Sequence, residues 1–396
     1  MPITRVAFVW PGLGWMGGIN YFRSLFYALH HYADGTVEPV LFTGKDSDTY
    51  GLEAYAKVVR TPLLDKKSLP WMLSKSIKAM TGGRELLLKR LLDQHNIEVI
   101  SHYNWLWKGC AIRSLAWIPD FQVLHLPECF PEQDRQATTA AMANAIKKSD
   151  AMLLSSEHAK SDLYHFCQDC LDAQAPHSYV LHFPSSFSGT LDELPSIDML
   201  REKYNLSDEP WFHVPNQFWM HKNHSLIIQA LKHLHKGGKA PLVLATGVAK
   251  DFRNPDYVPE LKRQLSDENL SDRFRMMEQI PYMDMMGLML HAIAVINPSR
   301  FEGWSTTVEE AKAFGKKLIL SDIEVHREQN PDRSYYVAVD DSEKLAELLS
   351  KCVLSYNAIE ERELSLNVFA DKEKSMKEFS NSYVSLILDL KTGCAT

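Results

Sequence analysis

The chain has 396 residues, of which 45% are hydrophobic and 23% charged, and its formal net charge is −7. This length exceeds the size at which one hydrophobic core usually divides, so we expect two domains. The acidic balance argues against nucleic acid as a partner, because phosphates require a basic surface. The apolar runs are too short to span a bilayer and the start does not resemble a signal peptide, so we expect a cytoplasmic protein.

The first half of the chain alternates short apolar runs with longer amphipathic ones. Residues 5–10, 38–43, 97–103, 121–126 and 150–156 are predicted strands, and 20–32 and 137–149 are predicted helices. A looser segment with scattered Pro, Ser and Gly, 183–210, is the predicted connection between domains. Strands that alternate with helices predict a parallel sheet covered on both faces.

The same rhythm restarts after the connection. We expect strands at 211–216, 240–247, 274–280, 292–299 and 316–322, and helices at 225–238 and 375–391. The sequence thus predicts an α/β protein with two domains of similar size, 1–195 and 196–375, and a C-terminal helix, 376–396, that packs back on the body.

A glycine-rich turn follows the first predicted strand. Gly12, Gly14 and Gly17 have the G-x-G-x-x-G spacing of a dinucleotide-binding loop, but the second strand ends in Thr43 and Gly44 rather than in the acidic residue that would hold a ribose. A nicotinamide cofactor is therefore not expected. The glycines indicate either close approach of the backbone to another ligand or a tight turn without one.

Two other short motifs favour structural readings. Asp46 and Asp48 form D-x-D, a pattern that can hold a divalent ion but is common on polar loops. Cys167 and Cys170 form C-x-x-C late in a helical pattern, with no second ligand pair for zinc. We expect a solvated loop, ordinary helix cysteines and no metal site.

The stretch 297–322 carries the most chemistry. A buried strand leads to Glu302, Gly303 and Trp304, and a helix is predicted to begin at 305–307, with Thr306 and Glu309 at the spacing of a capping box. The free N–H groups and the dipole at such a helix start bind anions. Glu302 and Glu310 would then flank the anion and accept hydrogen bonds from hydroxyls, which describes a nucleotide-diphosphate sugar.

A second helix start offers a cation. A strand is predicted to end at Asn216, and Lys222 stands just before an amphipathic helix. An ammonium group there would face a diphosphate held between the two helix starts.

Glu302 and Glu310 form the E-x7-E element of family 4 glycosyltransferases, which this chain resembles, in particular the bacterial members that build surface polysaccharides. The segments "MGGINYF", "VLHLPE", "SDAMLLSSEHAKSDL", "HKNHSLIIQAL" and "EQIPYMDMMGLM" fall in the order of that family. The resemblance implies the GT-B fold, with two Rossmann-like domains facing each other across a cleft, and a retaining transfer of a sugar from a nucleotide sugar to a hydroxyl acceptor.

The resemblance also implies roles for individual residues. Lys222 corresponds to the lysine that contacts phosphate, Glu310 to the ribose ligand and Glu302 to the carboxylate near the transferred sugar. The family commonly has an arginine where this chain has Asn216, so one cation fewer balances the diphosphate. The backbone of Ser305, Thr306 and Thr307, with Gly303 and Trp304 before it, must then carry more of that charge.

Further expectations concern the base, the reacting sugar and the acceptor. Backbone near 279–282, including Ile280 and Tyr282, is expected to recognise the nucleotide base. His125 matches the histidine near the reacting sugar, and His102 is the competing candidate. Gly17 and Gly18 resemble the glycine loop that faces the donor phosphate and the acceptor.

The predicted partners are a nucleotide sugar and a saccharide or lipid-linked acceptor in O-antigen, capsule or exopolysaccharide synthesis, without cofactor or metal. Residues 66–90 contain seven Lys or Arg against one acid, Glu85, which indicates either docking on the anionic inner face of the cytoplasmic membrane or a solvated helix pair. The alternatives to a transferase are a nucleotide-sugar epimerase of the same fold and a non-catalytic subunit that binds sugar nucleotides.

Overall fold

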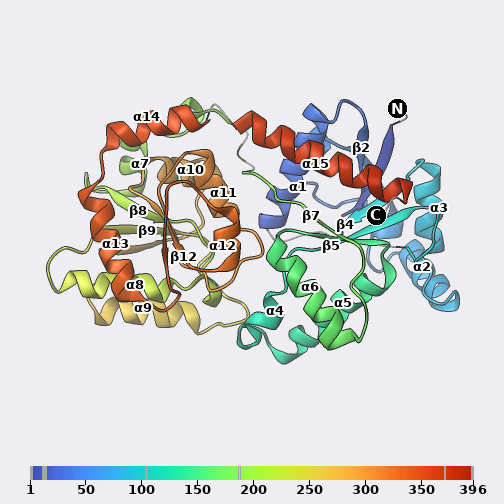
Figure 1. Ribbon diagram of the computed structural model, residues 1–396, viewed down its shortest axis with the longest axis horizontal. Helices are drawn as coiled ribbons and strands as arrows, with labels where there is room; N and C mark the ends of the chain where they lie inside the picture. Colours follow the sequence, from blue (N-terminus) through green and yellow to red (C-terminus); the bar gives the residue numbers. More distant parts are fainter. Residues whose placement is uncertain are drawn as a thin grey trace. The chain divides into compact units, whose positions relative to one another are not determined.

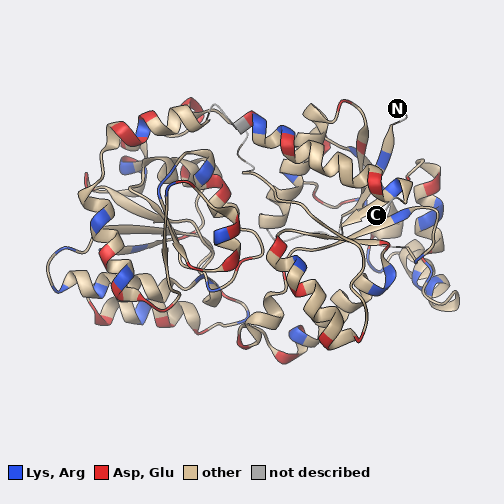
Figure 2. Ribbon diagram, in the orientation of Figure 1, with Lys and Arg blue, Asp and Glu red and all other residues tan. Residues whose placement is uncertain are grey.

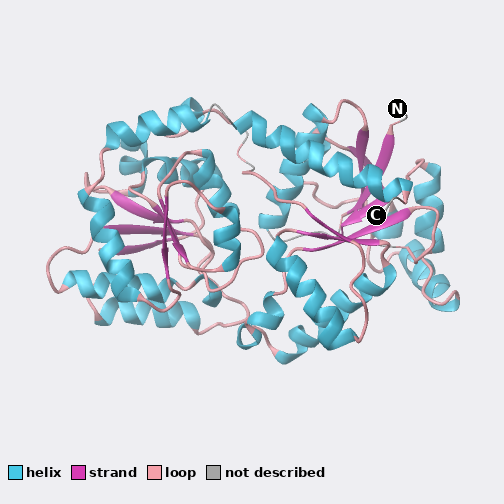
Figure 3. Ribbon diagram, in the orientation of Figure 1, coloured by secondary structure: helices cyan, strands magenta, loops and turns pink. Residues whose placement is uncertain are grey.

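The computed structural model describes residues 3–10, 16–102, 106–185, 187, 189–369 and 372–393, which form two compact units. The first unit comprises Met1–Phe121, Gln136–Ser186 and Glu373–Thr396, and the second Gln122–Arg135 and Phe187–Lys372. Each unit contains one sheet flanked by helices (Figures 1 and 3). The predicted divisions at 195/196 and 375/376 lie close to the observed changes at 186/187 and 372/373, but the sequence did not indicate that 122–135 group with the second unit.

The first unit has a seven-stranded sheet in which all neighbouring strands are parallel, in the order β3-β2-β1-β4-β5-β6-β7. The strands are β1 Thr4–Val9, β2 Val37–Thr43, β3 Lys57–Arg60, β4 Val99–His102, β5 Arg113–Ile118, β6 Ala151–Leu154 and β7 Ser178–Val180. Its helices are α1 Met16–Tyr32, η1 Leu52–Ala54, η2 Pro62–Leu64, α2 Leu69–Met80, α3 Leu86–Gln94, α5 Glu132–Lys148, α6 Glu157–Leu171 and α15 Lys372–Thr392.

The second unit has a six-stranded parallel sheet in the order β10-β9-β8-β11-β12-β13. Its strands are β8 Trp211–Val214, β9 Leu242–Thr246, β10 Phe274–Met277, β11 Val295–Asn297, β12 Leu318–Ser321 and β13 Ser334–Val337. Its helices are α4 Gln122–His125, η3 Pro127–Cys129, η4 Leu191–Glu193, α7 Ile197–Tyr204, η5 Met220–Lys222, α8 His224–His235, α9 Tyr257–Asp267, α10 Tyr282–His291, α11 Thr306–Ala313, α12 Glu324–Gln329, α13 Ser342–Leu354 and α14 Ala358–Phe369. In chain order this is the 3-2-1-4-5-6 arrangement of a Rossmann fold.

The second sheet has a separate core on each face. Leu231 of α8 and Leu349 of α13 share one buried cluster with Val243 of β9. Val308 of α11 shares another with Leu320 of β12. Because both faces are covered, the central strands are continuous apolar runs, as the sequence predicted.

The C-terminal helix α15 belongs to the first unit, which confirms the predicted return. Its Tyr383 is fully buried, and the phenol donates a hydrogen bond to the Ser101 hydroxyl at the end of β4 (3.0 Å). Lys391 pairs with Glu98 at 2.7 Å. The apolar stripe of the helix, Met376, Phe379 and Ile387, is buried as well. Among the described residues, no helix is both long and apolar enough to cross a membrane.

One predicted strand is wrong, and several elements were missed. Residues 121–126 contain the short helix α4, closed by a hydrogen bond from the Leu126 N–H to the Gln122 carbonyl at 2.9 Å. The strand in that part of the sheet is β5, just before it. A six-residue apolar run does not distinguish a strand from a buried helical turn. Within 183–210, taken as connection, the helix α7 forms with a Ser196 cap.

Candidate functional site

The candidate site lies at the carboxyl ends of β8 and β11, where the strand order of the second sheet reverses. These strands pair directly, with Val295 opposite His213, so the loops that follow them meet at one edge of the sheet. Ligands of open α/β sheets bind at such a switch point. The loop after β8 carries Asn216 and Lys222, and the loop after β11 carries Glu302.

Lys222 and Glu302 form a buried ion pair. The Lys222 Nζ lies 2.7 Å from Glu302 Oε1, and the side chains are only 14% and 9% exposed. Burial alone would raise the pKa of Glu302, but the adjacent Lys222 ammonium, together with hydrogen bonds from Lys222 and Ser299, outweighs it and lowers the pKa to about 2. Glu302 is therefore ionised at neutral pH, and the sequence did not predict that these two charges pair with each other.

A buried asparagine joins the two loops. Asn297, the last residue of β11, donates from Nδ2 to Ser305 Oγ at 2.8 Å and to Glu302 Oε1 at 3.4 Å. Its Oδ1 accepts from Asn216 Nδ2 at 3.2 Å and from Ser299 Oγ at 2.6 Å. The sequence reasoning missed Asn297, although a fully buried amide that ends an apolar strand is an available signal.

The helix start at α11 differs in detail from the prediction. Ser305, not Thr306, is the N-cap, and its side chain accepts from the Val308 N–H. The predicted capping box is wrong, because the Glu309 carboxylate binds Gln329 Nε2 at 2.8 Å and Lys312 Nζ at 3.1 Å instead. Thr307 donates from its hydroxyl to Asn216 Oδ1 at 3.1 Å. Gly303, Trp304 and Thr306 are half-buried around the helix start.

Glu310 lies one turn into α11 and is almost fully buried. The Tyr282 hydroxyl at the start of α10 donates to its Oε1 at 3.0 Å. Desolvation raises the pKa of Glu310 to about 7, and the bond from Tyr282 only partly opposes this shift. Ile280, before α10, packs as a partly buried side chain on the apolar cluster of Leu244.

The turn that presents Lys222 is held from three sides. The Asp251 carboxylate accepts the Met220 N–H at 2.9 Å, and Asn223, at φ +59°, donates to the carbonyls of Pro298 and Val339 at 3.1 and 2.8 Å. At Gly247, φ is +153° and a Cβ would stand 2.5 Å from the Asn216 carbonyl oxygen. Asp251, Asn223 and Gly247 were not among the predicted site residues, because their roles depend on contacts between distant segments.

The two candidate histidines differ in environment. His125 is exposed on α4 in the second unit. The centre of its ring lies 5.0 Å from that of Phe301, the residue that precedes Glu302 in the chain. His102 is buried in the first unit between the Tyr21 hydroxyl (2.8 Å) and the Ser101 hydroxyl (2.8 Å), and burial lowers its pKa to about 3. His102 therefore has the surroundings of a core histidine.

The remaining predicted residues lie in the first unit. Gly17 and Gly18 are in the first turn of α1, Gly17 half-buried and Gly18 buried, while Gly12 and Gly14 lie outside the described residues. Cys167 is buried and Cys170 exposed on α6, as predicted for helix cysteines. Asp46 and Asp48 are exposed after β2, and the Asp48 carboxylate accepts the Tyr50 N–H at 2.7 Å.

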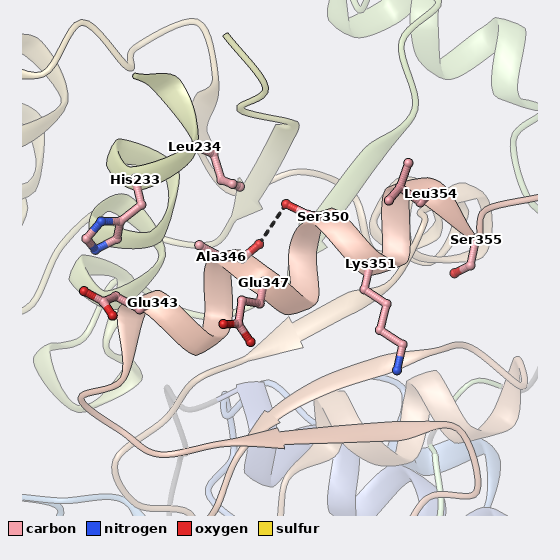
Figure 4. A pocket seen from close by; sticks show the side chains of 9 residues that line it. All are labelled: His233, Leu234, Glu343, Ala346, Glu347, Ser350, Lys351, Leu354 and Ser355. Carbon is pink, nitrogen blue, oxygen red and sulfur yellow. Dashed lines mark hydrogen bonds between the residues drawn. The ribbon is translucent and has the colours of Figure 1, made fainter. Parts of the chain in front are cut away.

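A groove of about 760 Å³ in the second unit lies between α8 and α13 (Figure 4). It is lined mainly by α13, including Glu343 and Lys351, with His233 and Leu234 of α8. None of the predicted site residues lines it, so we assign it to the seam between two packed helices.

A comparison with known proteins supports the candidate site at the carboxyl ends of β8 and β11. Residues 196–365 match the family model described as glycosyl transferases group 1. No curated protein matches the chain in sequence. The matched range contains the starts of α8 and α11 and the Lys222–Glu302 pair.

Solved structures resemble the whole chain in fold. A glycosyltransferase from Rickettsia africae ESF-5 has 14% identity and a TM-score of 0.65, with 99% of each chain covered. Anabaena Alr3699/HepE in complex with UDP and glucose has 14% identity and a TM-score of 0.67, with 98% of this chain and 100% of that chain covered. WaaG, a glycosyltransferase involved in lipopolysaccharide biosynthesis, has 13% identity and a TM-score of 0.57, with the same coverage. The predicted GT-B fold of two Rossmann-like units is confirmed, and 196–365 carry the sequence features of group 1 glycosyl transferases.

Proposed function

We propose that this protein is a retaining glycosyltransferase that moves a sugar from a nucleotide-diphosphate sugar to a hydroxyl of a saccharide or lipid-linked acceptor. The observation that carries the proposal is the pairing of a lysine and a glutamate beside the start of α11, at the switch point of the second sheet. The family match over 196–365 and the UDP and UDP-glucose complexes of Anabaena Alr3699/HepE support it.

In this proposal the diphosphate occupies the start of α11. The N–H groups of Thr306 and Thr307, with the Lys222 ammonium, stabilise the negative charge that grows as the sugar departs. The N–H of Ser305 already donates to Gln329 Oε1 at 3.3 Å, and that of Val308 donates to the Ser305 side chain. Glu302 holds hydroxyls of the transferred sugar, and Glu310 accepts hydrogen bonds from the ribose. Asn216 supplies no charge, and its side chain bridges Asn297 and Thr307 instead.

The remaining roles follow the resemblance. His125 lies near the reacting sugar, the backbone at 279–282, with Ile280 and Tyr282, contacts the base, and Gly17 and Gly18 serve the donor phosphate and acceptor. The transfer needs no divalent metal, since a lysine and a helix start supply the positive charge. A role in surface polysaccharide synthesis is part of the proposal, supported by the likeness to WaaG.

We also propose that the first unit docks on an anionic membrane surface through α2 and α3. Figure 2 shows Lys and Arg gathered along these helices. The apolar side chains of Leu69 and Met72 are 81% and 51% exposed between them. Glu85 pairs with Lys75 and Lys78. Lys66 and Lys67, just before α2, are exposed.

The test is donor binding followed by transfer. A thermal-shift screen with UDP-, GDP- and dTDP-sugars should raise the melting temperature for one donor class, because a ligand of the native state stabilises it. The donor so found, incubated with candidate acceptors, should give a product with the donor's anomeric configuration by NMR. Formation of epimerised donor in the absence of an acceptor would contradict the proposal. Transfer activity that requires added Mg²⁺ and is lost with EDTA would contradict it as well.

A further inference from the structure

A buried histidine joined by hydrogen bonds to the loop of Glu302 has no assigned role. Its partner Ser321 donates from Oγ to the carbonyl of Ser299, three residues before Glu302, at 2.5 Å. His326 lies on α12, is 0% exposed, and its Nδ1 is 2.9 Å from the Ser321 carbonyl oxygen and 3.1 Å from the Ser321 hydroxyl. A carbonyl oxygen can only accept, so Nδ1 carries the proton. Nε2 is then an acceptor, it is buried, and it has no hydrogen-bond partner among the described residues.

Glu302 and Lys222 are the charged groups that shift the pKa of His326, while other charged residues nearby pair with each other. Burial lowers the pKa of His326, while the Glu302 carboxylate raises it and the Lys222 ammonium lowers it. On α11, Glu309 and Lys312 pair with each other at 3.1 Å, and on the loop before α12, Asp322 pairs with Arg327 at 2.7 Å. β13 contributes Tyr336, whose hydroxyl donates to the His326 carbonyl at 3.3 Å.

Two anionic groups would interact with the same Lys222 ammonium when a nucleotide is bound. In the structure it neutralises Glu302 at 2.7 Å. A diphosphate at the α11 start would attract the same ammonium, and Asn216 offers no second cation. A buried carboxylate that loses its cation is strongly destabilised unless another positive charge replaces it.

We propose that His326 supplies that charge: when a nucleoside diphosphate draws Lys222 from Glu302, His326 takes up one proton at Nε2. The inference rests on the proposed function of the same site. The proton comes from solvent, and the Nδ1–H group keeps its hydrogen bond to Ser321. The neutral imidazole thereby becomes an imidazolium, whose positive charge compensates that of Glu302. No bond other than N–H forms. Nucleotide binding is therefore coupled to proton uptake, and affinity falls as pH rises.

Calorimetry of UDP, GDP and dTDP binding in buffers of different ionisation enthalpy tests this coupling. The slope of the observed heat against buffer enthalpy gives the protons exchanged. At about pH 7.5 the terminal phosphate is largely ionised, because its pKa is about 6, so phosphate contributes little. We expect uptake of up to about one proton per nucleotide for the unaltered chain.

Three variants localise the proton. His326→Gln should bind nucleotide without uptake, and Glu302→Gln should do the same, because no carboxylate then needs compensation. His213→Gln is the matched control. His213 is also fully buried in the second unit, with Nε2 against Thr246 at 2.9 Å and an unpartnered Nδ1 among the described residues, and burial is the cause of its lowered pKa. This variant should keep the uptake.

The outcomes separate the two proposals. Absence of binding for all three nucleotides refutes the proposed function. Binding without proton uptake, or uptake that persists in His326→Gln, refutes the role of His326. If His326→Gln fails to fold, ¹⁵N NMR of the unaltered chain decides, because UDP should shift the His326 Nε2 resonance from the neutral to the protonated range at constant pH.

Discussion

The Tyr282 hydroxyl donates a hydrogen bond to the Glu310 carboxylate over 3.0 Å, and it is the hydrogen-bond partner of that carboxylate within the described part of the chain. Among the residues that the structure describes, no cation pairs with this buried acid. Desolvation therefore raises its pKa from 4.5 to about 7. A carboxyl group whose pKa is raised in the folded state stabilises the fold below its unfolded pKa, and that contribution is lost as pH rises through the folded pKa.

We predict that Glu310→Gln stabilises the protein at pH 8 by roughly 2–3 kcal/mol and much less at pH 4.5, since the amide has no charge to desolvate. Urea unfolding at both pH values measures the difference. Nucleotide affinity should fall in the same variant, because an amide accepts fewer hydrogen bonds from a ribose. Equal effects on stability at both pH values would show that desolvation of Glu310 is not the cause.

Lys222→Ala should lower kcat by roughly a hundredfold or more, since removing one preorganised charge costs about 3 kcal/mol in the transition state. It should also lower the free energy of unfolding, because Glu302 stays buried without its cation. Steady-state kinetics and urea unfolding measure the two effects. The double variant Lys222→Ala/Glu302→Gln should recover stability but not turnover. A folded Lys222→Ala protein with unaltered turnover would refute the proposed role.

Glu302→Gln should weaken binding of the nucleotide sugar but not of the free nucleoside diphosphate, because this side chain is assigned to hydroxyls of the sugar. Calorimetry with UDP and UDP-glucose, or with the pair for the donor base found, compares the two. The pKa of Glu302 is held near 2, so the contribution of its ion pair to stability is present above pH 4.5 and lost only as pH falls toward 2. The ratio of nucleotide-sugar affinity to free-nucleotide affinity should therefore fall by the same factor at pH 6 and pH 8.

Gly18→Val should reduce turnover while nucleotide affinity stays close to that of the unaltered chain. The candidate nucleotide site belongs to the second unit, whereas Gly18 is buried in the first turn of α1 in the first unit. Initial rates and calorimetry on the same preparation compare the effects, and thermal melting checks the fold. An equal loss of nucleotide binding would favour a nucleotide site in the first unit.

Replacement of Lys66 and Lys67 by Glu should reduce association with anionic vesicles, since each basic residue near such a surface adds about 1 kcal/mol. Flotation with phosphatidylglycerol-containing liposomes at low salt measures it. Lys236→Glu/Lys239→Glu, exposed on the second unit, is the control with the same change in charge and should float as the unaltered chain does. Absence of lipid association by the unaltered chain would leave α2 and α3 as a solvated helix pair.

The sequence predicted the elements whose apolar runs are long and buried. β1, β2, β8, β9 and β12 are such runs, and all were found. The short strands β3, β7 and β13 were missed, because at the edges of a sheet they are half-buried and lack a continuous apolar pattern. Edge strands need less apolar surface, so their sequences resemble loops. The buried strand β5 was missed for another reason: the apolar run 121–126, which follows it, was taken for the strand.

The candidate site was predicted in its charged residues but not in its polar framework. Lys222, Glu302 and Glu310 stand out as charges beside helix starts. Asn297 and Gly247 matter because segments from different strands approach each other, and a single sequence does not encode that distance in a local pattern. The ion pair between Lys222 and Glu302, eighty positions apart in the chain, was unpredictable for the same reason.

The membership of α15 in the first unit has a consequence for biosynthesis. As the ribosome adds residues from the N-terminus, the second unit is complete once Lys372 has emerged, but the first unit still lacks its last segment. Until then the part of the first unit that buries Phe379, Tyr383 and Ile387 stays uncovered, and Ser101 lacks the phenol that binds it. The domain that is translated first is therefore the last to finish folding, and a nascent chain released early exposes apolar surface that chaperones must shield.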